Sequence, residues 1–175
     1  RLKRAFTEQV KGLLAGGVDG FIIETMSALD ETVIAIEAVK SQCDLPVLVS
    51  LAYGENKLGY RTMMGVDIVS VVKKVLPLGV SAVGFNCGTV SMDGYVAIAK
   101  EYKQAIADSG IAILSEPNAG QPELEDGNAV YKLSPENFAD YAAKIHSAGA
   151  TILGGCCGTT PDHIRAMAKR LKNDK

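Results

Sequence analysis

The sequence predicts an α/β fold built on a parallel sheet. Five apolar segments of strand length recur along the chain, and each is followed by a segment with helical character. The five segments are apolar throughout instead of alternating with polar residues, which is typical of parallel strands that are covered on both faces. This alternation of strands and helices predicts a single α/β domain over residues 1–175.

The expected elements follow one another regularly. Gly16-Gly17 ends the first helix, and Asp30 is expected to cap the second. Ser134-Pro135 and Thr160-Pro161 are typical starts of the last two helices. The strands are expected at residues 18–23, 46–51, 82–85, 111–115 and 151–153. The helices are expected at residues 5–15, 31–41, 67–76, 94–108, 134–148 and from residue 160 onward, with long loops at 52–65 and 116–133.

Residues that could act in catalysis or bind a ligand lie where the expected strands end. Glu24, Cys87, Asn118 and the pair Cys156-Cys157 all lie at or just beyond the C-terminal end of a different strand. Active sites occupy this edge both in a (β/α)8 barrel and in an open doubly wound sheet, and periodicity alone does not separate the two. The sequence contains neither a GxGxxG fingerprint nor a P-loop, so nothing in it supports nucleotide binding.

Two adjacent cysteines between glycines form the most specific pattern, in the run GGCCG at 154–158. Adjacent cysteines strain if they bond to each other, but flexible flanking residues allow both thiolates to turn toward a metal. Cys87, beside Gly88 at the end of another strand, supplies a third thiol. Three thiolates and one open position are typical of catalytic zinc, because structural zinc normally has four protein ligands.

Composition excludes several classes of protein. A net charge of −2 without a basic run argues against a nucleic-acid partner, and no apolar stretch approaches the roughly 20 residues of a membrane span. Four cysteines without a disulfide framework, and no signal-peptide pattern, predict a cytoplasmic location. Cys43 is interpreted as a core residue, and His146 and His163 are not expected to bind metal. A redox or structural-zinc protein is disfavoured because Cys-x-x-Cys and finger-like spacings are absent.

Four stretches resemble the homocysteine S-methyltransferase family: GVDGFIIET at 17–25, VGFNCG at 83–88, SEPNAGQP at 115–122 and GGCCGTTPDHI at 154–164. The resemblance implies a (β/α)8 TIM barrel in which Cys87, Cys156 and Cys157 hold Zn²⁺. It further implies that the metal binds homocysteine as a thiolate, which attacks a methyl donor and gives methionine. Glu24 would then pair with the substrate ammonium, while Asn118 would orient the site or fill the open zinc position.

The PNAG loop is most similar to that of the homocysteine module of cobalamin-dependent methionine synthase. This similarity implies methylcobalamin as the donor, carried by a separate corrinoid protein or domain and not bound by this chain. Betaine and S-methylmethionine remain alternative donors.

The chain also departs from the family pattern. The Asp-Gly-x-x-Gly-Thr turn of the family's first segment is absent, and the resemblance begins in the helix before the fourth barrel strand. The chain is therefore expected to cover strands four to eight, the C-terminal portion of a homocysteine-binding barrel, completed by an N-terminal segment or a partner chain. The alternative is a catalytically incomplete fragment that acts as an interaction or assembly module.

Overall fold

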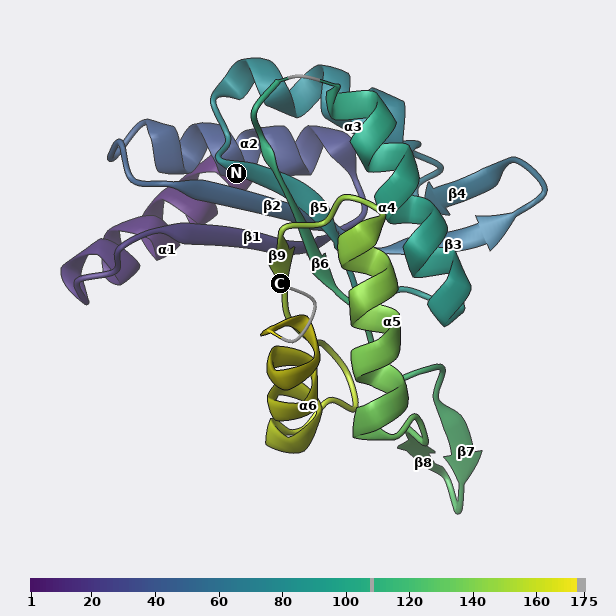
Figure 1. Cartoon of the computed structure of the whole chain (residues 1–175). Helices are drawn as coiled ribbons and strands as arrows, with labels where there is room; N and C mark the ends of the chain where they lie inside the picture. Colours follow the sequence, from purple (N-terminus) through teal and green to yellow (C-terminus); the bar gives the residue numbers. More distant parts are fainter. Residues whose placement is uncertain (108, 173–175) are drawn as a thin grey trace.

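The computed structural model describes residues 1–107 and 109–172. Its centre is a parallel sheet whose five strands stand side by side in chain order, as Figure 1 shows. The sheet confirms the α/β class and the five expected strands. Its members are β1 (Phe21–Met26), β2 (Val47–Leu51), β5 (Ala82–Asn86), β6 (Ala112–Glu116) and β9 (Ile152–Leu153).

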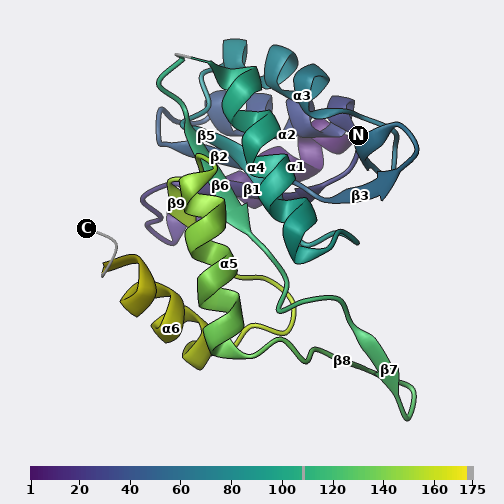
Figure 2. The same cartoon turned by 45° about the vertical axis from the view of Figure 1, so that its right-hand side comes forward.

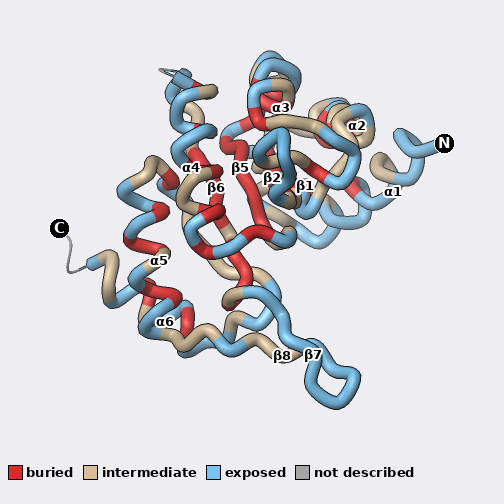
Figure 3. Tube along the Cα trace, turned by 90° about the vertical axis from the view of Figure 1, so that its right-hand side faces the viewer, coloured by how far each residue is buried: buried red, intermediate tan, exposed pale blue. Residues whose placement is uncertain are grey.

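The helices pack against one another in sequence along the sheet (Figure 2). Phe85 in β5 stacks between Tyr95 and Tyr102, which anchors the middle of the sheet to this helical layer. The central strand β5 is buried along its whole length (Figure 3). The helices are α1 (Leu2–Ala15), α2 (Leu29–Lys40), α3 (Ile68–Val75) with the 3-10 turn η1 (Leu76–Leu78), α4 (Met92–Ile106), α5 (Pro135–Ser147) and α6 (Pro161–Lys172).

The strand order distinguishes between the two architectures that periodicity left open. A doubly wound sheet reverses its strand order at a switch point, whereas these strands run in one direction across the sheet. Right-handed crossovers that all advance the same way place their helices on the same face. The prediction that both faces are covered fails at the two outer strands of the described sheet: Ile22 in β1 and Ile152 in β9, on the other face, are 46% and 36% exposed.

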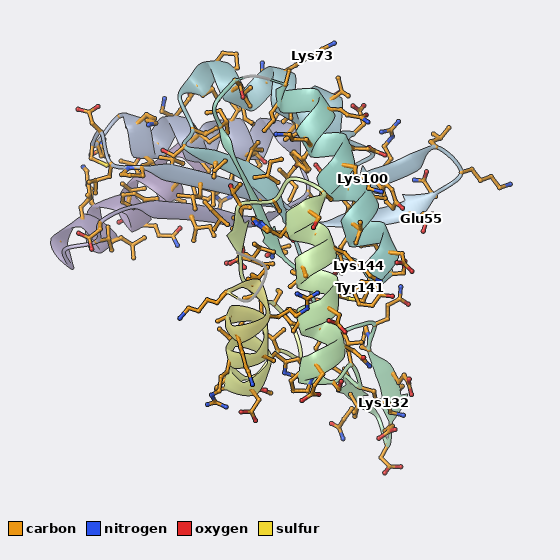
Figure 4. All side chains as sticks on the ribbon, in the orientation of Figure 1. Glu55, Lys73, Lys100, Lys132, Tyr141 and Lys144 are labelled. Atoms are coloured by element: carbon orange, nitrogen blue, oxygen red, sulfur yellow. The ribbon has the colours of Figure 1, made fainter. Side chains whose placement is uncertain are left out.

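Both long loops contain an antiparallel hairpin that the sequence analysis did not predict. The first is β3 (Tyr53–Asn56) with β4 (Gly59–Thr62), and the second is β7 (Glu123–Glu125) with β8 (Asn128–Val130). Lys132 bridges Glu123 and Glu125 at 2.5 and 2.6 Å beside the second hairpin (Figure 4). Both hairpins follow the C-terminal end of a parallel strand, β2 or β6, which is the edge that carries the candidate site.

Several predicted boundaries shift. The first strand begins at Phe21, whose N–H donates to the Pro46 carbonyl, and it continues past Glu24, so Glu24 lies within the strand instead of after it. The second helix begins at Leu29, with Asp30 in its first turn and not as its cap. The fourth helix ends at Ile106, and the predicted terminus at residue 108 lies outside the described residues. No helix in the described ranges is long and apolar enough to cross a membrane.

Candidate metal centre

The structure brings together the three cysteines that the sequence analysis singled out. Cys87 follows β5 directly, and Cys156 and Cys157 lie between β9 and α6. The Sγ atoms of all three lie within 4.8 Å of one another, with Cys157 3.8 Å from Cys87 and 3.9 Å from Cys156. Cys43, the fourth cysteine, is partly buried against the core and is not part of this group. All four cysteines are free.

An unusual backbone turn presents Cys87 to the site. Cys87 and Gly88 both have positive φ angles, +51° and +85°, so the chain turns sharply where β5 ends. A Cβ atom on Gly88 would fall 2.1 Å from the Tyr53 carbonyl oxygen, and only glycine therefore fits this approach. The Tyr95 hydroxyl donates to the Cys87 carbonyl at 2.6 Å, and the Cys87 N–H donates to the Glu116 carbonyl at 3.2 Å. The backbone at Cys87 and Gly88 is thus held by contacts from β3, α4 and β6.

The loop carrying the other two cysteines is fixed in the same way. The Cys156 N–H donates to the Pro117 carbonyl at 2.9 Å, and the Thr159 hydroxyl donates to the Cys156 carbonyl at 2.7 Å. His163 closes the start of α6 because its Nδ1 accepts from the Thr160 N–H at 3.2 Å while Nε2 lies 2.9 Å from the Leu133 carbonyl. Both ring nitrogens of His163 are therefore engaged away from the cysteines.

Asn118 joins the two cysteine-bearing loops. Its side chain is almost fully buried, with Oδ1 accepting from the Cys157 N–H at 3.1 Å and Nδ2 donating to the Gly88 carbonyl at 3.3 Å. In this conformation both ends of the amide are occupied by backbone groups. The contacts place Asn118 at the site, and they are those of a residue that orients the two loops.

Glu24, on β1, is linked to the cysteine cluster by the buried side-chain amide of Asn86. Asn86 Nδ2 donates to Glu24 Oε1 at 3.2 Å and lies 3.8 Å from the Cys156 sulfur. Asn86 was not among the predicted site residues, although it stands next to Cys87 and is the polar end of an otherwise apolar strand. Tyr131, after β8, was also missed: its hydroxyl interacts with the Cys157 thiol, and its ring packs where a Cβ on Gly158 would lie, 2.2 Å from the ring Cγ.

The electrostatics of the cluster favour a bound cation. Burial is the main cause that raises the pKa of the Cys156 thiol to about 11, while the hydrogen bond from Asn86 lowers the pKa and the neighbouring Cys87 raises it. Burial and the nearby Glu24 also raise the pKa of the Glu116 carboxyl. Three closely spaced thiols resist losing all their protons without a compensating charge, and sulfur ligands suit Zn²⁺. The donor set therefore fits zinc.

Comparisons with known proteins identify the family of the chain. A family model described as homocysteine S-methyltransferase matches residues 1–171. The methionine synthase of Mycobacterium leprae is 32% identical over 171 residues, and that of Mycobacterium tuberculosis is 31% identical over 180 residues. These matches cover 95% and 99% of this chain, but the chain spans only 14% of the length of either relative.

Solved structures show the same fold. The apo form of the homocysteine methyltransferase MmuM from Escherichia coli superposes with a TM-score of 0.74 at 24% identity, covering 96% of this chain and 57% of that one. A putative phosphonomutase from Burkholderia cenocepacia has a TM-score of 0.65 at 15% identity, over 94% of this chain and 71% of that one. At these identities the likeness concerns the fold alone.

Proposed function

The chain belongs to the homocysteine S-methyltransferase family, and from this premise we propose that it carries the zinc site of an enzyme that methylates the sulfur of homocysteine to give methionine. The convergence of the Cys87, Cys156 and Cys157 sulfurs within 4.8 Å carries the proposal. These thiols come from two loops at the C-terminal edge of a parallel sheet, where α/β enzymes place their catalytic groups.

The chemistry requires a thiolate. A free thiol has a pKa near 8.5 and is mostly protonated at neutral pH, whereas the thiolate is the nucleophile. Zinc held by Cys87, Cys156 and Cys157 supplies a Lewis acid that favours the deprotonated form of the substrate thiol. The chain's own contribution is to keep three thiols at one point: Tyr95 holds the Cys87 carbonyl, and Asn118 ties both loops together.

Glu24 is proposed to bind the ammonium group of the substrate. It is an exposed carboxylate on β1, linked to the cysteine cluster through Asn86 Nδ2, which is 3.2 Å from Glu24 Oε1 and 3.8 Å from the Cys156 sulfur. A carboxylate at this position would form an ion pair with the ammonium group of homocysteine while the sulfur of the same molecule lies at the cysteine cluster. Asn118 is proposed to orient the site, because its amide is already bonded to the backbone of both cysteine loops.

We propose methylcobalamin, carried by a separate corrinoid protein or domain, as the methyl donor. The similarity to methionine synthases and the Pro117-Asn118-Ala119-Gly120 loop support this choice over betaine or S-methylmethionine. The relatives are about seven times longer than the matched region, since the chain spans 14% of each, and that length leaves room for a donor-binding part outside it.

The sheet is proposed to form strands four to eight of a (β/α)8 barrel that another segment or a partner chain completes. The five parallel strands follow one another in chain order, as the strands of a barrel do, and the structural match covers 57% of the MmuM chain; both observations support this arrangement. The outer edges of β1 and β9 have no partner strand within the described residues. These edges also favour the second candidate, an incomplete barrel that serves as an interaction or assembly module, because unpaired strand edges promote association.

Zinc analysis with X-ray absorption at the zinc edge, with and without L-homocysteine, tests the proposal. We expect about one zinc per chain, and three sulfur ligands that become four when the thiol is added. A Cys43→Ser variant is the matched control and should behave as the wild type, whereas Cys156→Ser should lose zinc. Absence of zinc, or a sulfur count that homocysteine does not change, would favour the assembly module.

A further inference from the structure

Asn86 occupies the centre of the site without being a proposed ligand or substrate contact. It ends β5, the middle strand of the sheet, directly before Cys87, and its side chain is fully buried. Burying an amide is unfavourable unless its polar atoms are hydrogen-bonded. Every polar atom of this amide has a partner, and those partners come from β1, β2 and the Cys156 loop.

The orientation of the amide follows from its surroundings. Asn86 Oδ1 lies 3.0 Å from the backbone nitrogen of Thr25 and 2.8 Å from the Ser50 hydroxyl. A backbone N–H only donates, so the amide atom facing it must be the oxygen. The amino group of Asn86 is consequently turned toward the carboxylate and the sulfur.

The amino group faces more acceptors than it has hydrogens. Nδ2 lies 2.7 Å from Thr25 Oγ1, 3.2 Å from Glu24 Oε1 and 3.8 Å from the Cys156 sulfur. An amide carries two N–H groups, and the short contact to the Thr25 hydroxyl takes one of them. The second hydrogen is left between a carboxylate and a sulfur.

We infer that Asn86 is a positioning residue that shares one amide hydrogen between the Glu24 carboxylate and the Cys156 sulfur, and so couples the amino-acid subsite to the metal centre. The inference rests on the proposed function. When a substrate ammonium neutralises Glu24, the carboxylate becomes a weaker acceptor and the hydrogen turns toward Cys156. The Cys156 thiolate then donates less charge, so a metal held by the three cysteines attracts the incoming substrate sulfur more strongly.

Thr25 is built into the same arrangement. Its φ angle is +61°, a conformation that is uncommon for a β-branched residue. Its N–H and its hydroxyl both contact the Asn86 amide. Thr25 therefore controls how many amide hydrogens remain for Glu24 and Cys156, which provides a way to perturb the sharing while Asn86 stays in place.

The test uses the cobalt(II)-loaded chain and its thiolate-to-cobalt charge-transfer band. A hydrogen bond to a thiolate lowers the energy of its electrons, so the band moves to shorter wavelength. Thr25→Val removes the hydroxyl acceptor and should shift the band to shorter wavelength, whereas Thr25→Ser keeps the hydroxyl and should leave it in place. Glu24→Gln should also shift the band to shorter wavelength, and most of that shift should vanish when Asn86→Ser is added.

Metal affinity gives a second measure. Loss of a group that supports a metal ligand typically lowers affinity 10- to 100-fold, so we expect a loss of about that size for cobalt in Asn86→Ser. Identical bands in Thr25→Val and Thr25→Ser, or an equal Glu24→Gln shift with and without Asn86, would overturn the coupling while leaving the metal site intact. A chain without any thiolate-to-cobalt band would overturn the proposed function together with the coupling.

Discussion

Gly88→Ala offers the sharpest test of how the cysteine site is built, because a second glycine separates its two effects. Gly88 has a φ of +85°, and a Cβ there would lie 2.1 Å from the Tyr53 carbonyl oxygen, about 1.3 Å inside the 3.4 Å at which ordinary contact begins. Gly17 at the end of α1 has nearly the same φ, +80°, but a Cβ there would meet nothing within 4 Å. Gly17→Ala therefore reports the backbone strain alone.

The expected magnitudes follow from these two geometries. A left-handed conformation costs a non-glycine residue roughly 1–2 kcal/mol, which is the full effect expected for Gly17→Ala. Gly88→Ala adds overpacking against a backbone atom that no rotamer change can move, which typically costs 1–3 kcal/mol more. The shift that relieves the overlap also moves Thr89, whose N–H donates to the same Tyr53 oxygen at 3.0 Å. The free energy of unfolding should fall by about 2–5 kcal/mol.

Urea unfolding of the metal-free chains measures the stability, and competition with a chelator measures the affinity for zinc. Since Gly88 follows Cys87 directly, Gly88→Ala should weaken zinc binding, while Gly17→Ala should leave it unchanged. Equal losses of stability in the two variants, with equal zinc affinity, would refute the argument that close approach to Tyr53 sets the position of Cys87.

Three further predictions concern the groups around the cluster. The pKa of about 11 keeps the Cys156 thiol protonated at pH 6–8 in the metal-free chain. Zinc binding must displace this proton, so the proton should contribute a tenfold rise in zinc affinity per pH unit across this range, measured by chelator competition. Because burial raises the pKa of Glu116, its carboxylate opposes folding at neutral pH; Glu116→Gln should stabilise the chain at pH 7 in thermal unfolding, and a gain that persists after the wild-type carboxyl is protonated in acid would contradict this. Tyr95→Phe leaves the Cys87 carbonyl without its 2.6 Å donor and should lower the free energy of unfolding in urea by about 1–3 kcal/mol; an unchanged value would show that the bond is not needed.

The sequence allowed the strands and the three cysteines to be predicted because both signals are local. Five apolar runs mark the sheet, and glycine-flanked cysteines at strand ends mark the site. The hairpins at 53–62 and 123–130 were not predicted because their strands are only three or four residues long, and those of the second hairpin are almost entirely exposed. Short exposed strands lack the alternating pattern that periodicity detects.

The network around the cysteines could not be predicted for a different reason. Asn86 contacts Glu24 and Thr25, about 60 positions earlier, and Cys156, 70 positions later, so only the sheet register shows that they meet. Asn118 likewise was expected at the site, but its bonds to Gly88 and Cys157 depend on how the β6 loop crosses both cysteine loops. A single sequence contains no signal for such long-range amide contacts.

The position of each group in the sheet separates metal binding from substrate binding. Cys87, Cys156 and Cys157 follow β5 and β9, and the loop after β6 holds both segments, so these ligands are fixed by strands that this chain itself pairs. Glu24 instead lies on β1, whose other edge has no partner strand among the described residues and whose neighbouring Ile22 is exposed. Metal affinity should therefore be largely a property of this chain, whereas affinity for the amino-acid part of the substrate should depend on whatever pairs with β1.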